Sequence, residues 1–123
     1  MKSLDQLRAE HAYGIADRYR DNDDFRNLAE KLPVMMRTNG LLATWAFLMA
    51  KKYHDMAQAL QCHLTDPVLG LRVPEGDDIT VFRRWVGELG SQTCLNGTDL
   101  RRLTEEAIAF AGWLRRAVQA YKP

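Results

Sequence analysis

Four arginines in this chain have no acidic residue at helical spacing. Arg37, Arg83, Arg115 and Arg116 each lack an Asp or Glu three or four positions away, where side chains of one helix face meet. A guanidinium group is always charged and presents its N–H donors in a planar fork that matches a phosphate or a carboxylate. We therefore predict that these four arginines contact a partner, either a protein surface or a phosphate backbone.

Most other basic residues have an acid at helical spacing, and for them a solvated surface is the ordinary interpretation. Such pairs are weak, about 0.2–0.5 kcal/mol each, and indicate no ligand. The expected pairs are Arg8–Asp5, Arg26–Asp23, Arg26–Glu30, Lys51–Asp55, Arg84–Glu88, Arg101–Glu105 and Arg102–Glu106.

Trp113 precedes two of the unpaired arginines on what should be one helix. Tryptophan and arginine are enriched at protein interfaces, so Trp113 with Arg115 and Arg116 predicts a partner-binding surface. Two alternatives stay open. Trp113 could pack beneath a second layer of the fold while the arginines extend into solvent. Arg37 could serve only to stabilise the C-terminal end of a helix.

The cysteines and histidines form no recognisable metal or catalytic motif. Structural zinc sites use paired ligands such as Cys-x-x-Cys, whereas Cys62 and Cys94 lie far apart. A Cys62 nucleophile with His54 or His63 as its base has no supporting motif. We expect no metal, no cofactor, no small-molecule substrate and no catalysis. An enzyme that uses Cys62 or Cys94 is the remote alternative.

Composition places further limits on the function. The chain has 123 residues and a formal net charge of +1. This length suits one domain, residues 1–123, and the near-neutral charge argues against a polybasic tail for nucleic acid. The N-terminus lacks the apolar core of a signal peptide, and no apolar run is long enough to cross a bilayer. We expect a cytoplasmic protein that does not enter the membrane.

The N-terminal half of the chain shows helical periodicity that two residues should interrupt. Ser3 begins a capping box for a helix that ends near residue 20, on whose apolar face His11 should be a hydrogen-bonded core histidine. A second helix begins at the acidic pair 23–24, and Pro33 should kink or restart it. Asn-Gly at 39–40 should end that helix with a positive φ at Gly40. Residues 41–50 then predict a helix that is buried all round.

The C-terminal half contains an irregular segment and one long helix. Helices are expected over 53–64 and 79–89, with a Pro- and Gly-rich loop between them. The last helix should begin with Thr98 or Asp99 as its N-cap and end near Lys122. Its apolar stripe comprises Leu100, Leu103, Ala107, Phe110, Ala111, Leu114, Val118 and Tyr121. The predicted fold is all-α, a compact bundle of five or six helices with a long amphipathic C-terminal helix.

Two blocks of the sequence resemble one known family, the small subunit of the Cmr complex, which is the type III-B CRISPR effector that targets RNA. The residues that match its first motif are Leu32, Pro33, Asn39, Gly40, Leu41, Ala46, Phe47 and Leu48. Those similar to its closing helix are Glu105, Ala107, Trp113, Leu114, Arg115 and Arg116. Residues 65–97 match nothing in the family.

The resemblance implies a non-catalytic subunit that acts in antiviral defence. It would stack with further copies of itself beside the backbone subunits of the complex and help to line the groove for target RNA, while other subunits cleave. The implied partners are the other Cmr subunits and the guide and target RNA. The candidate RNA- or partner-binding residues are Arg37, Arg83, Trp113, Arg115 and Arg116. The alternative is a free-standing helical adaptor that binds protein but no RNA.

Overall fold

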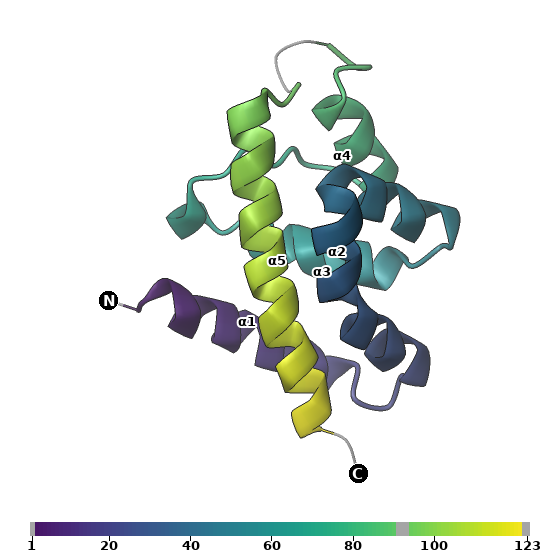
Figure 1. The fold of residues 1–123 in the computed structure, drawn as a ribbon, viewed down its shortest axis with the longest axis vertical. Helices are drawn as coiled ribbons and strands as arrows, with labels where there is room; N and C mark the ends of the chain where they lie inside the picture. The colour runs from purple at the N-terminus through teal and green to yellow at the C-terminus, as the bar shows by residue number, and fades with distance from the viewer. Residues whose placement is uncertain (1, 91–93, 122–123) are drawn as a thin grey trace.

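The computed structural model describes residues 2–90 and 94–121, and these residues form helices with short connections between the first three and longer ones on either side of the fourth (Figure 1). The α-helices are α1 (Leu4–Arg18), α2 (Asp23–Ala50), α3 (His54–Leu64), α4 (Asp78–Trp85) and α5 (Gly97–Ala120), with one 3-10 turn, η1 (Pro67–Leu69). The described residues include no strand. The prediction of an all-α bundle of five or six helices with a long final helix is confirmed.

α1 begins as the sequence predicts. The backbone N–H of Gln6 donates to Ser3 Oγ at 3.1 Å, and the N–H of Ser3 donates to Gln6 Oε1 at 2.8 Å, which completes the capping box. Its inner face buries Leu7, Ala12 and Ala16. The small alanines allow α5 to pack closely across α1.

α2 departs from helical geometry at Gly40 and not at Pro33. Gly40 has φ 82° and ψ 173°, a conformation open essentially to glycine alone, whereas the helix neither ends nor restarts at Pro33. Of the two expectations for Pro33, a kink or a restart of the helix, the restart was therefore wrong. Leu32, Pro33 and Met36 are all buried, and their packing offsets the backbone hydrogen bond that proline removes.

The second half of α2 is less buried than its sequence predicts. From residue 41 to residue 50, Leu41, Thr44, Trp45 and Leu48 are buried, but Ala43 and Ala50 are exposed and the rest are half-buried. The prediction of a helix buried all round was wrong. Small alanines on the outer face made an ordinary amphipathic helix look uniformly apolar.

Two buried tryptophans hold the irregular segment between α3 and α5. Trp45 donates from Nε1 to the carbonyl of Asp78 at 2.9 Å, and Trp85 donates to the carbonyl of Arg72 at 3.2 Å. Their rings meet edge to face, with centroids 5.0 Å apart. The segment that follows α3 is thus tied to the core through indole N–H groups.

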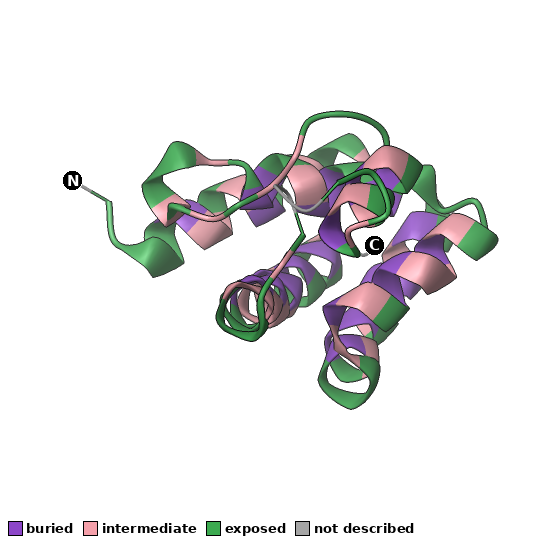
Figure 2. Cartoon of the chain, turned by 90° about the horizontal axis from the view of Figure 1, so that it is seen from above, coloured by how far each residue is buried: buried purple, intermediate pink, exposed green. Residues whose placement is uncertain are grey.

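α5 lies across α1 and α2 and, after α2, contributes the most residues to the buried core (Figures 1 and 2). Its predicted stripe is buried from Leu103 to Val118, with Leu100 and Tyr121 half-buried at the ends. The N-cap was predicted wrongly: Asn96 caps the helix, accepting the N–H of Asp99 at 2.8 Å. Lys122, the predicted end, lies outside the described residues. Among the described helices, none combines the length and apolar character needed to span a membrane.

Candidate functional site

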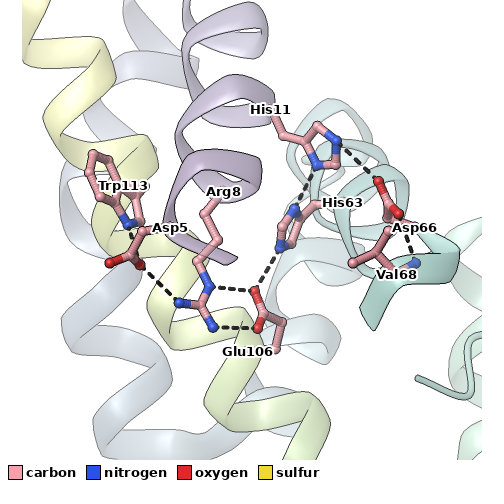
Figure 3. Close-up of polar contacts among 8 residues, drawn as sticks. All are labelled: Asp5, Arg8, His11, His63, Asp66, Val68, Glu106 and Trp113. Carbon is pink, nitrogen blue, oxygen red and sulfur yellow. Dashed lines mark hydrogen bonds and ion pairs between the residues drawn. The ribbon is translucent and has the colours of Figure 1, made fainter. Parts of the chain in front are cut away.

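Trp113 lies on the side of α5 that faces the N-terminal part of α1 (Figure 3). Its ring is half-buried and packs against the core, which lies between the two alternatives left open by the sequence. Its Nε1 donates to Asp5 Oδ1 at 3.4 Å, and the same oxygen accepts from Arg8 at 3.0 Å. Only part of the indole is therefore available to a partner.

Arg116 is held by Trp113. Its guanidinium carbon lies 5.2 Å from the centroid of the indole ring, which is cation–π geometry. The two residues form one exposed feature on the last turns of α5, a flat guanidinium resting on an aromatic face. Such a pair can still receive an anion, because stacking leaves the edge donors of the guanidinium in solvent.

Arg115 and Arg37 agree best with the sequence prediction. Both side chains are exposed, and neither forms an ion pair with any residue in the described ranges. Arg37 lies on the turn of α2 just before Gly40, so its positive charge can also stabilise the carbonyl groups of that turn.

Arg83 does have an acidic partner, which corrects the sequence prediction. Its guanidinium lies 2.8 Å from Glu88, five residues later. α4 ends at Trp85, and Gly87 with φ 86° turns the chain back so that the N–H of Glu88 donates to the carbonyl of Arg83 at 2.9 Å. Helical spacings of three and four residues do not reveal a pair that a turn brings together.

The five candidates do not form one compact site. Trp113, Arg115 and Arg116 lie toward the C-terminal end of α5, whereas α4, which carries Arg83, lies beside the opposite end of α5 (Figure 1). A long polymer or a large protein surface can reach separated contacts, but a small ligand cannot.

A buried polar cluster was missed in the sequence. Glu106, only 8 % exposed, accepts from Arg8 Nε at 2.9 Å and Arg8 Nη2 at 2.7 Å, and lies 2.8 Å from His63 Nε2 (Figure 3). The expected Arg102–Glu106 pair is thus replaced by a bidentate contact with α1. A signal existed: Glu106 falls within the apolar stripe, between Leu103 and Phe110.

The electrostatics of this cluster favour the charged forms of the ion pair. Burial alone would raise the pKa of Glu106, but the hydrogen bonds from Arg8 and His63 outweigh it and lower that pKa to about 2. The hydrogen bond to Glu106 raises the pKa of Arg8, although burial opposes it. The cluster joins α1, α3 and α5 through charged groups.

His63 is not placed to act as a base for Cys62. Both ring nitrogens of His63 are engaged, with His11 and with Glu106, so His63 has no free nitrogen to serve Cys62 as a base. His54 Nδ1 lies 2.6 Å from Asp78 Oδ2. Within the described residues, no three His, Cys, Asp or Glu side chains are grouped as metal ligands.

One comparison with known proteins identifies a match along almost the entire chain. Residues 4–121 match the family model described as CRISPR-associated protein (Cas_Cmr5). The matched region includes every helix and every candidate residue described above.

Proposed function

The chain belongs to the Cas_Cmr5 family of CRISPR-associated proteins, the small-subunit family of Cmr complexes, and from this premise we propose that it is a non-catalytic subunit of a type III-B effector. In this role it stacks with copies of itself beside the backbone subunits and helps to line the groove for target RNA. The family match over residues 4–121 is the observation that carries the proposal.

The exposed residues of the molecule support the role of a scaffold that makes few contacts with RNA. Arg37 and Arg115 are exposed and have no ionic partner within the described part of the chain, and the stacked Arg116 adds a third charge near Arg115. Widely separated arginines suit a phosphate backbone that runs past the subunit. Such contacts are independent of sequence, because pairing with the guide reads the target.

The near-neutral charge supports stacking of copies. A formal net charge of +1 keeps mutual repulsion small when identical chains lie side by side. Trp113 and Arg116 would then contact a protein neighbour or the RNA near the C-terminal end of α5. Arg83 would contact a partner near the opposite end of α5 only after its ion pair with Glu88 breaks.

The salt dependence of RNA affinity tests the contact residues. In the reconstituted complex, each phosphate contact on a single strand contributes about −0.7 to the slope of log affinity against log salt concentration. Arg115→Ala and Arg37→Ala each remove one guanidinium, so each should make the slope shallower by about 0.7 if that group binds one phosphate. The effects of the two substitutions should add in the double variant.

Arg20→Ala is the matched control, because Arg20 is an exposed arginine that is already paired with Asp17 at 3.3 Å. Its slope should equal that of the wild type. An unchanged slope in the double variant, with the complex intact, would remove Arg37 and Arg115 as RNA contacts. A complex whose RNA affinity does not depend on this chain at all would favour the protein-only adaptor.

A further inference from the structure

Two histidines in the core touch each other and each faces a carboxylate (Figure 3). His11 of α1 and His63 of α3 approach through their Nδ1 atoms at 2.8 Å. His63 Nε2 lies 2.8 Å from Glu106 Oε2, and His11 Nε2 lies 3.4 Å from Asp66 Oδ2. The contacts therefore form a series: carboxylate, imidazole, imidazole, carboxylate. The proposed function involves none of these four side chains.

In this series of contacts, the hydrogen bonds need more protons than two neutral imidazoles supply. Three contacts each need one proton, and the two terminal carboxylates, when ionised, can accept a hydrogen bond but cannot supply a proton. Two neutral imidazoles supply two protons. If His63 donates to Glu106, then His63 Nδ1 accepts from His11, and the Nε2 lone pair of His11 is left facing the carboxylate of Asp66. One contact lacks a proton until one imidazole becomes a cation.

We propose that the His11–His63 pair is a binding site for one additional proton, and that its uptake closes the contact between His11 and Asp66. Asp66 also accepts the N–H of Val68 through Oδ1 at 3.0 Å and thereby caps η1. The hydrogen bond that this proton completes, between His11 and Asp66, thus links α1 to η1. The proposal is independent of RNA binding.

The surroundings of the pair decide where the proton enters and at what pH. The His63 side chain is fully buried and stacks on Phe110 at 4.1 Å, whereas the His11 side chain is 24 % exposed in the groove between α1 and α3. The proton therefore enters through His11.

Charged groups approach the pair from α1, α5 and the residues after α3. Burial and the nearby His63 lower the pKa of His11, with a further lowering by Lys2, and Asp66 opposes them. Arg8 from α1 and Glu106 from α5 face His63, and Glu10, Arg18 and Cys62 line the groove beside His11. Uptake is expected at a pH below the ordinary range of histidine, and it belongs to the pair as a unit.

An NMR titration of the imidazole nitrogens between roughly pH 4 and pH 8 tests the proposal. The chain holds three histidines, so the signals of His11 and His63 need to be separated only from those of His54. We expect His63 to keep its Nε2–H throughout, His11 to take up the proton below pH 6.5, and the Val68 amide signal to shift with the same midpoint. Two independent titrations of ordinary midpoint for His11 and His63 would overturn the proposal.

Asp66→Asn gives the decisive variant because asparagine is an equally good cap for the Val68 N–H. Loss of the carboxylate should move the His11 midpoint to lower pH, since Asp66 favours the cation. An unchanged midpoint would overturn the proposal. His11→Gln provides a second check: the acid-induced shift of the Val68 amide should vanish, and its persistence at the same midpoint would also contradict the assignment.

Discussion

At the scale of single residues, Glu106 shows how a charge can hold a helical core together. It lies in the apolar stripe of α5, yet its partner Arg8 is 98 residues away in sequence. The stripe predicted that Glu106 would face inward, but no local pattern could name a partner from the other end of the chain. Local spacing rules found Arg8–Asp5 and Arg26–Asp23 and missed the buried contact.

Glu106→Gln should destabilise the protein by about 2–4 kcal/mol, because the variant removes the buried carboxylate that binds Arg8 in a bidentate contact and leaves Arg8 with only the exposed Asp5. Urea unfolding measures this change in the free energy of unfolding. The adjacent, exposed Glu105→Gln is the control and should change stability by less than about 0.5 kcal/mol. Equal changes in the free energy of unfolding for the two substitutions would show that the buried contact does not stabilise the fold more than an exposed glutamate does.

The same carboxylate predicts part of the acid sensitivity of the fold. The pKa of Glu106 falls from 4.5 to about 2 on folding, so the folded state binds this proton less readily than the unfolded state. The stabilisation is therefore complete above pH 4.5 and is lost as the pH falls from 4.5 toward 2. The stability difference between the wild type and Glu106→Gln, measured by urea unfolding across this range, should shrink as the pH falls. A constant difference would contradict the assignment.

At the scale of elements, the sequence located the helices but misjudged what interrupts α2. Asn39-Gly40 correctly predicted a positive φ at Gly40, where helical geometry is interrupted, because only glycine accepts φ 82° with ψ 173° easily. Pro33 was given too much weight, since buried neighbours on both sides hold the helix through it. The N-cap of α5 was missed by a few residues, because Asn96, Thr98 and Asp99 are all good capping residues.

Gly40→Ala should destabilise the fold by about 1–3 kcal/mol, although a Cβ there meets no atom within 4 Å. The cost comes from the backbone conformation and not from a clash. Gly14→Ala is the matched control: it also has open space, but it lies inside α1, where alanine should stabilise the helix by about 0.5–1 kcal/mol. Thermal unfolding of both variants would check this, and a stabilising Gly40→Ala would refute the conformation assigned to Gly40.

At the scale of the whole molecule, the fold was far easier to predict than the working surface. Apolar residues recur at helical spacing along the chain, and this pattern indicates which face of each helix is buried. It therefore predicted both the helical bundle and the buried stripe of α5. Contacts with partners leave no such repeat. The absence of a local acid singled out Arg37 and Arg115, which are indeed exposed, but also Arg83, which a turn pairs with Glu88.

The most direct test of the proposed role is recovery of the tagged chain from cells that contain its native partners, followed by identification of the bound proteins and RNA. We predict that the other Cmr subunits and the guide RNA co-purify with it in fixed ratio. A second preparation of Arg37→Ala plus Arg115→Ala should retain the proteins, because neither side chain packs in the core. Recovery of the wild-type chain alone, or with protein partners but no RNA, would contradict the account.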